Sequence, residues 1–282
     1  MPVAPVIYRS SDASAPVLTG TAGDLITLLN ACLVAGYGAK SAPSTPWVRQ
    51  TGFAGNSSTK AVFRQGAGNQ FYLDVNDAGA AGVLTGATPK EAAVRGYEAM
   101  TDVSTGTNPF PTTAQIAAAT ASWRKSASAD TVPRGWWLIA DDRTFTLGIL
   151  DGDTVGLYKV YHFGDFYSLT TADGYRTICG TRTTQNGTGV TGTLEAATLA
   201  SALNVQAPAG WYAARIAAGS GTSNLEGILS LGSSVPSTDT FPAADGSLWL
   251  SRFVLSDATV PQMRGWMRGV YRVNQPTGLN DG

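Results

Sequence analysis

Several residue types from which proteins build reactive or charged sites are scarce in this chain. Its 282 residues include one histidine, two cysteines and five lysines, only 14% of the residues are charged, and the net charge is −1. The cysteines do not stand at the spacing of a zinc site, so we expect no metal and no other cofactor. A chain this poor in cations also lacks the basic footprint that nucleic-acid binding requires.

Long apolar runs and the common catalytic motifs are missing as well. The most apolar window, residues 25–35, is shorter than the roughly 20 residues of a membrane-spanning helix, so we expect no membrane partner. No phosphate-binding loop and no Gly-x-Ser-x-Gly turn occurs. Residues 1–3 lack the basic start of a signal peptide, which predicts folding in a cytoplasm with Cys32 and Cys179 reduced and buried.

Alternation of apolar and polar residues is the main structural signal, and it predicts antiparallel β-sheet. The clearest example is a three-stranded meander with predicted strands at 136–140, 144–149 and 154–163. An Asp-Gly turn separates the last two of these strands, a combination that favours a hairpin. Further strands are predicted at 61–65, 70–76, 166–169, 175–179, 211–216, 227–231 and 247–255.

Helical periodicity is strong in one segment only, residues 24–35. Its leucines and Cys32 recur at helical spacing, Asp24 is placed to cap the first turn, and Gly36 follows the last. These residues would form one apolar face of the helix. An apolar helix face packs either into the core or against a partner protein, and packing into the core is favoured. A capping box at 88–91 predicts a second short helix that ends at Gly96, and weaker signals occur at 112–115 and 196–203.

Together these patterns predict a mainly β protein, in which antiparallel meanders form β-sandwich or barrel-like modules with an N-terminal arm and a few short helices. We divide the chain into an N-terminal arm and short amphipathic helix at 1–40, a main antiparallel β domain at 41–187 and a smaller C-terminal β module at 188–282. The boundary at 187 lies in a run rich in Thr, Gly and Asn.

The candidate catalytic residues are few, and each has a structural explanation. His162 is the lone histidine, and we expect a hydrogen-bonded structural residue rather than a catalyst. The other option is a carboxylate pair for sugar hydrolysis, drawn from a group of aspartates that stand near aromatic residues. Aspartate is also the usual occupant of hairpin turns, so we expect no enzyme. The group consists of Asp141, Asp142, Asp151, Asp153 and Asp165.

Arginines and aromatic residues are concentrated near the C-terminus, and these types are enriched at the centres of protein interfaces. RNA binding would use the same types, but the near-zero net charge favours protein. Packing into the core of the C-terminal module is the alternative. We predict a contact to a neighbouring subunit formed by Arg264, Trp266, Arg268, Tyr271 and Arg272.

Three short stretches carry a resemblance to a known group of proteins: residues 96–101, 108–112 and 135–143, which read GYEAMT, NPFPT and GWWLIADDR. In these short stretches and in its overall sequence character, the chain from Val6 to Cys179 resembles a family of tailed-bacteriophage virion proteins. The resemblance implies a structural component of the particle and carries no catalytic residues.

On this basis we predict a virion structural protein, made in the bacterial host cytoplasm. We favour the tail or baseplate, with other virion proteins as partners and several copies in the particle. A capsid decoration protein would share the same arm and β core. A carbohydrate-binding fibre module for host attachment is the alternative from another class, because exposed aromatic residues on a β scaffold suit sugars.

Overall fold

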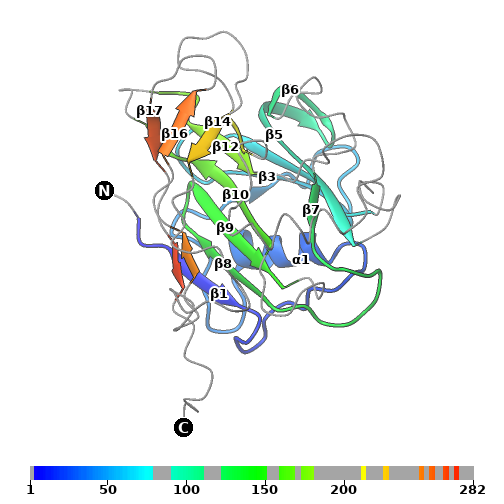
Figure 1. Ribbon diagram of the computed structural model, residues 1–282. Helices are drawn as coiled ribbons and strands as arrows, with labels where there is room; N and C mark the ends of the chain where they lie inside the picture. The colour runs from blue at the N-terminus through cyan, green and yellow to red at the C-terminus, as the bar shows by residue number, and fades with distance from the viewer. Residues whose placement is uncertain are drawn as a thin grey trace, which may run out of the picture.

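A computed structural model describes residues 3–78, 90–110, 122–150, 159–168 and 173–180, together with the backbone of six short strands after residue 210. Within these residues the protein is mainly β, as predicted, with two large antiparallel sheets and one helix (Figure 1). The predicted meander is confirmed at 136–140, 144–149 and 159–163, whereas residues 154–158 of its third predicted strand lie outside the described residues, and it occupies the centre of the first sheet. This sheet has the spatial order β1 (Val6–Arg9), β8 (Trp136–Ala140), β9 (Thr144–Ile149), β10 (Lys159–Asp165), β12 (Thr177–Gly180) and β13 (Trp211–Ala213).

The second sheet contains the predicted hairpin of residues 61–65 and 70–76. Its order is β2 (Val48–Arg49), β3 (Lys60–Arg64), β4 (Tyr72–Asn76), β5 (Glu91–Asp102) and β6 (Thr105–Phe110), and β7 (Ser122–Arg124) pairs with the beginning of β5. The capping-box prediction was wrong here, because Glu91 begins a 12-residue strand instead of a helix. Ala92 and Val94 alternate into the core, and strands pair with both edges of β5. These nonlocal contacts override the local signal.

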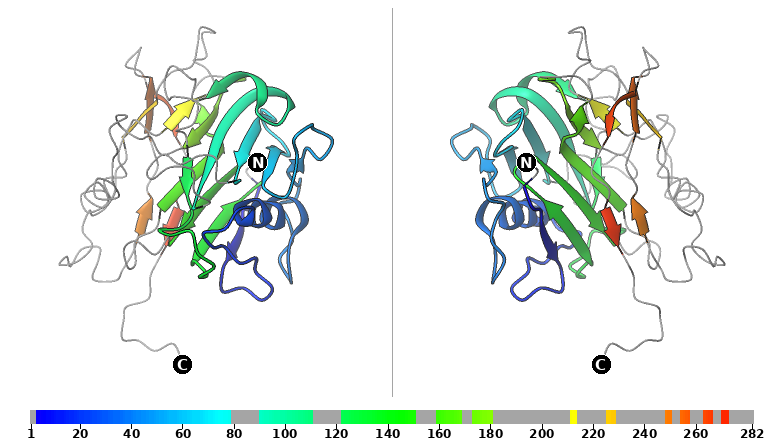
Figure 2. Two further views of the ribbon diagram at one scale, coloured as in Figure 1. Left: turned by 90° about the vertical axis from the view of Figure 1, so that its right-hand side faces the viewer. Right: turned by 90° about the vertical axis from the view of Figure 1, so that its left-hand side faces the viewer.

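The C-terminal strands form two smaller groups, which stand on the side of the first sheet opposite the helix (Figure 2). One group has the order β11 (Tyr167–Ser168), β17 (Met263–Trp266), β16 (Val254–Asp257) and β14 (Leu225–Ile228), and the other pairs β15 (Leu248–Leu250) with β18 (Val270–Arg272). The helices predicted at 112–115 and 196–203 lie outside the described residues. The division of the chain into three regions stays a prediction, and strands from all three regions meet in the first sheet.

The core lies between the two sheets, and every second residue along the strands of the first sheet points into it. Ala140, Phe145, Phe163 and Cys179 are neighbours across β8, β9, β10 and β12, and all four are buried. The next rung, which contains Thr146 and His162, faces away from this core because side chains alternate along a strand. Cys32 and Cys179 are both free and buried, which confirms that prediction.

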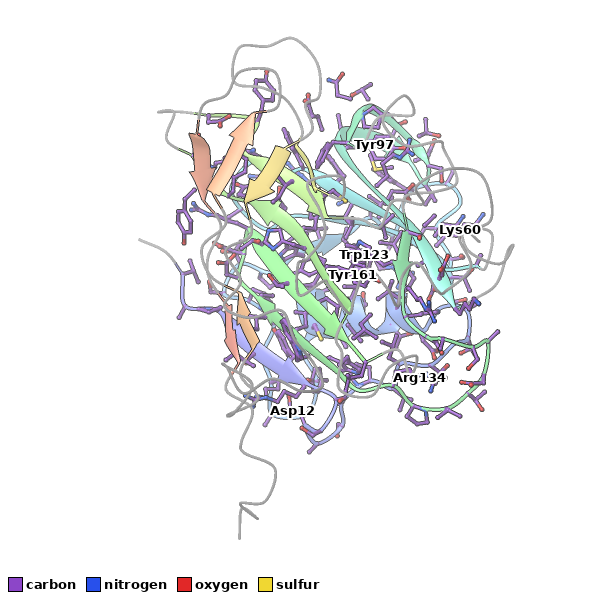
Figure 3. All side chains as sticks on the ribbon, in the orientation of Figure 1. Asp12, Lys60, Tyr97, Trp123, Arg134 and Tyr161 are labelled. Carbon is purple, nitrogen blue, oxygen red and sulfur yellow. The ribbon has the colours of Figure 1, made fainter. Side chains whose placement is uncertain are left out.

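Buried aromatic side chains of the two sheets contact one another and form hydrogen bonds from one sheet to the other (Figure 3). Trp123 of β7 stacks on Tyr161 of β10 with ring centroids 5.3 Å apart. The Trp123 indole donates to the Gly180 carbonyl at 2.7 Å, and the Arg124 amide donates to the Tyr161 hydroxyl at 2.8 Å. Because a buried indole or phenol must find a partner, these bonds fix how the sheets face each other.

The single helix packs its apolar face into this core, as predicted. α1 (Asp24–Leu29) continues as a π-helical segment, η1 (Asn30–Ala35), which ends at Gly36 with φ +80°. The expected cap was wrong: Asp24 is the first helical residue, and its carboxylate accepts hydrogen bonds from Thr19 and Thr21. Among the described residues, no helix is long and apolar enough to cross a membrane.

The beginning of α1 is instead held by Asp77, which is distant in the sequence and follows β4. Its Oδ2 accepts a hydrogen bond from the Leu25 amide at 3.0 Å. Its Oδ1 lies 2.5 Å from Nζ of Lys125, which also donates to the Thr21 carbonyl, and both charged side chains are completely buried. One ion pair therefore joins the helix to segments that follow both β4 and β7.

The predicted N-terminal arm is an edge strand of the first sheet. β1 pairs with β8 along its length, and Tyr8 lies in the core. On the free side of β1, Lys40 Nζ donates to the Ile7 carbonyl at 3.0 Å, and Asp12 bonds both the amide and the carbonyl of Arg9. Three backbone groups on this edge therefore already have partners from the same chain.

Candidate functional site

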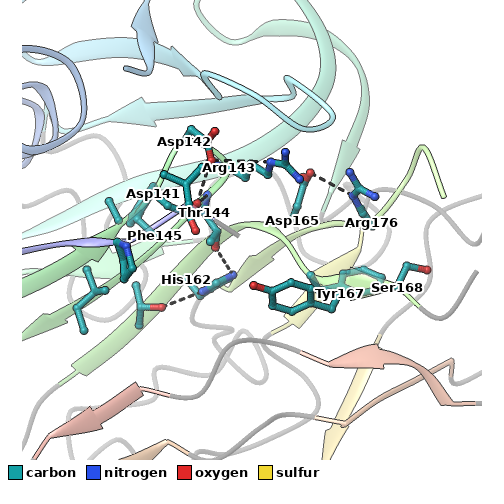
Figure 4. A pocket seen from close by; sticks show the side chains of 16 residues that line it. Asp141, Asp142, Arg143, Thr144, Phe145, His162, Asp165, Tyr167, Ser168 and Arg176 are labelled. Carbon is teal, nitrogen blue, oxygen red and sulfur yellow. Dashed lines mark hydrogen bonds and ion pairs between the residues drawn. The ribbon is translucent and has the colours of Figure 1, made fainter. Parts of the chain in front are cut away.

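A cavity of about 390 Å³ lies against the face of the first sheet that points away from the core (Figure 4). Its walls come from the β8–β9 turn, from β9, β10 and β11, and from the N-terminal segment. The polar side chains among its lining residues are Asp141, Asp142, Arg143, Thr144, Thr146, His162, Asp165, Tyr167, Ser168 and Arg176. The volume is in the range of about 300–1,000 Å³ that is typical of small-molecule sites. This cavity is therefore the candidate functional site.

Asp141 closes the tight turn between β8 and β9 at one wall of the cavity. Its Oδ1 accepts hydrogen bonds from the amides of Arg143 and Thr144, both at 2.9 Å. The Asp141 carbonyl accepts a bond from the Trp47 indole at 2.9 Å, and the Asp142 carbonyl accepts one from the Ala67 amide. Asp141 thus has the turn-forming role that is usual for aspartate.

Asp165, at the end of β10, is the centre of a second network. Its Oδ1 accepts from Thr177 Oγ1 at 2.7 Å and from Gln65 Nε2 at 2.9 Å. Its Oδ2 accepts from the Asn69 amide at 3.1 Å and lies 3.4 Å from Nε of Arg176. Four donors around one buried carboxylate join the turn between β3 and β4 to the first sheet, so this carboxylate has a structural task.

His162 lies in β10 between two threonines of β9 and is only 4% exposed. Its Nε2 is 3.1 Å from Thr144 Oγ1, and its Nδ1 is 3.0 Å from Thr146 Oγ1. A neutral imidazole has one donor and one acceptor nitrogen, and a threonine hydroxyl fits either. Burial lowers the pKa of His162 from its ordinary value of 6.5 to about 3. The geometry agrees with the structural role predicted for this residue.

We expect His162 to make the protein less stable in acid. Between pH 6.5 and about 3 the unfolded chain holds a proton on this ring that the folded protein excludes. As the pH is lowered through this range, the free energy of unfolding therefore decreases by up to about 1.4 kcal/mol per pH unit. Urea unfolding of the wild type and of His162→Gln at pH 7, 6, 5 and 4.5 measures this slope, and the variant should show a shallower one.

The difference between the two slopes is the informative quantity in this experiment. Burial raises the pKa values of Asp74 and Asp77 to about 6, and this favours the folded state as the pH falls from 6 towards 4. Both proteins contain these aspartates, so their effect cancels in the comparison. Equal slopes for wild type and variant would show that His162 is not held neutral.

The residues predicted as a subunit interface fall on two separate strands. Arg264 and Trp266 belong to β17, Tyr271 and Arg272 belong to β18, and Arg268 lies outside the described residues. In strand register Trp266 is opposite Tyr167, a residue of the cavity wall. Tyr271 is opposite Trp249 in β15. The predicted interface itself stays a prediction.

Sequence reasoning identified the acidic and imidazole residues of the cavity but missed Tyr167 and Arg176. Both belong to segments that were predicted only as short strands. Tyr167 is in β11, which pairs with β17, and Arg176 directly precedes β12, which pairs with β10; both residues line the cavity. The alternation of Thr144 and Thr146 in β9 was the available signal for the partners of His162. Asp151 and Asp153 lie outside the described residues.

A metal centre is not supported within the described residues, where no three potential ligands from His, Cys, Asp and Glu gather. Comparisons with protein-family models, with curated proteins and with solved structures found no match for this chain. The resemblance to virion proteins therefore gains no support from these comparisons, and it stays a hypothesis.

Proposed function

We propose that the protein is a structural component of a tailed-bacteriophage particle, present in several copies and placed in the tail or baseplate. The observation that supports a structural role over an enzymatic one is that most titratable side chains of the cavity are already used in hydrogen bonds that hold the fold. Asp141, His162 and Asp165, the groups best placed to move a proton, are bonded into turns and between strands. Asp142 does have a carboxylate oxygen that accepts no hydrogen bond, but a glycosidase of the usual kind needs two available carboxylates.

The placement in a phage particle is supported by the sequence. The resemblance spans the segment that forms most of the two sheets, and the low charge suits a protein packed against neighbours. Large apolar side chains are also exposed at Ile7, Val17, Val48 and Val132. These side chains offer contact area to adjacent subunits.

Purified particles of the phage that encodes this chain provide the test. Mass spectrometry should detect the protein as a multicopy component, and immunogold labelling should mark the tail or baseplate. Absence of the protein from the particle would refute the structural proposal. Label on capsids alone would move the protein to the head, as a decoration protein.

The predicted subunit contact is tested by reversing charge near the C-terminus. We expect Arg268→Glu and Arg272→Glu to reduce incorporation into particles because an interface arginine loses its acidic or aromatic partner. The melting temperature of the isolated protein should not change. Lys60→Glu, a charge reversal in β3 of the second sheet, is the matched control. Normal incorporation of both C-terminal variants would contradict the interface.

A further inference from the structure

Three charged side chains of the cavity have hydrogen-bonding capacity left after their structural contacts. Asp142 is only 5% exposed, and its Oδ1 accepts no hydrogen bond. The nearby Nε of Arg143 is 3.8 Å away, which is beyond hydrogen-bond length. Within the described residues, the side chains of Arg143 and Arg176 make polar contacts only through Nε, to Asp142 and Asp165. Their terminal nitrogens remain as donors.

A buried carboxylate oxygen without a donor is unfavourable, and a ligand that donates a hydrogen bond would remove that penalty. Asp142 is held in a fixed position by its backbone. Its carbonyl is fixed by Ala67, and the preceding residue closes the turn. The Asp142 acceptor therefore belongs to a backbone-anchored wall of the cavity, and the guanidinium groups of Arg143 and Arg176 belong to the same lining.

The cavity also presents an aromatic surface. Tyr167 of β11 lines it and is 38% exposed, so part of the ring is open to contact. Phe166 contributes buried apolar surface to the same lining. An aromatic ring beside hydrogen-bonding groups suits a ligand with both a C–H face and a polar rim.

The balance of charge indicates which ligand class fits. Among the described lining residues there are three carboxylates and two guanidinium groups, and His162 is neutral, so these residues present an anion with a net negative wall. A purely apolar ligand would leave Asp142 and the arginines unsatisfied. A sugar hydroxyl both donates and accepts, as this mixed set requires.

We propose that this cavity binds a neutral carbohydrate through one pyranose ring. Sugar hydroxyls donate to Asp142 and accept from Arg143 and Arg176, and the C–H face of the ring packs against Tyr167. The site adds a binding activity to the proposed particle component and does not depend on that role. A protein that fails to enter particles could still bind sugar, and the reverse also holds.

Saturation-transfer NMR and titration calorimetry on the full chain test the proposal. The probes are the methyl pyranosides of glucose, galactose, mannose and N-acetylglucosamine, with inorganic phosphate as a counter-probe. We expect at least one pyranoside to bind with a Kd on the order of 1 mM, as for a weak small ligand. Asp142→Asn and Tyr167→Ala should each weaken binding roughly tenfold or more, because the first replaces a charged acceptor with a weaker neutral one and the second removes the aromatic contact.

Two controls separate binding from folding. Asp130→Asn changes an aspartate that pairs with Arg134 away from the cavity, and it should leave sugar affinity unchanged. Tyr167→Phe keeps the aromatic ring and should retain binding. If Asp142→Asn lowers the melting temperature, Arg176→Gln provides an independent variant, and it should weaken binding by a similar factor.

The outcomes that overturn the proposal are specific. Binding of none of the four pyranosides would refute it, and so would a bound pyranoside whose affinity survives Asp142→Asn, Tyr167→Ala and Arg176→Gln. Binding of phosphate without any sugar would identify an anion site instead.

Discussion

Replacing Trp47 with alanine is expected to lower the free energy of unfolding by roughly 3–5 kcal/mol, the usual cost of removing a large buried aromatic side chain. The indole is 1% exposed and packs edge-on against Phe145 and Phe163, with ring centroids 5.4 and 5.8 Å away. The substitution also removes the donor to the Asp141 carbonyl. Urea unfolding followed by circular dichroism measures the loss.

A second variant at the same position separates packing from hydrogen bonding. Trp47→Phe keeps most of the apolar contact but removes the indole donor to the Asp141 carbonyl. We expect a loss of about 1–3 kcal/mol, which is the cost of breaking one buried hydrogen bond. An unchanged dependence on urea concentration would show that both proteins unfold to similar states. A Trp47→Ala loss below about 1 kcal/mol would contradict the central position of this residue.

The ion pair between Lys125 and Asp77 carries the second large prediction. Lys125→Met leaves Asp77 buried without its cation, and we expect a loss of roughly 3–5 kcal/mol at pH 7. Burial already raises the pKa of Asp77 to about 6, and removal of the lysine should raise it further. The loss should therefore be smaller at pH 5, where the lone carboxyl group is protonated.

A double-mutant cycle tests whether the two charges act as a pair. Asp77→Asn alone leaves the lysine charge buried, whereas the double variant removes both charges and keeps an acceptor for the Leu25 amide. The double variant should thus be more stable than the sum of the single losses predicts. The partly exposed pair of Arg134 and Asp130 is the control, and Asp130→Asn should have little effect on stability because solvent screens exposed ion pairs. Additive losses at Lys125 and Asp77 would refute the coupling.

The parts of the fold that follow from local pattern could be predicted from the sequence. The strands of the meander and of the first hairpin have period-two alternation, and one helix has a clear apolar face, so their positions were close to those observed. Where the local signal conflicted with nonlocal pairing, prediction failed. The capping box before Glu91 was overridden by strands on both edges of β5, and the true cap of α1, Asp77, is 52 residues away from Leu25.

The candidate site was predictable to a smaller degree. Asp141, Asp142, Asp165 and His162 attract attention by residue type, but their roles depend on partners that only the three-dimensional structure brings close. Asp165, for example, is bonded by Gln65, which lies 100 positions earlier in the chain. Asp141 and Asp142 are adjacent in sequence, yet one closes a turn and the other retains an unsatisfied oxygen.

The occupied edge of β1 limits how two copies of this chain could pair. A sheet edge with free backbone groups invites pairing with another chain, and a net charge of −1 gives copies little electrostatic repulsion. Lys40 and Asp12 occupy three of the groups through which a second chain would add a strand. Two copies of the chain are therefore hindered from pairing backbone to backbone along this edge, which leaves only side chains there for contact with another chain.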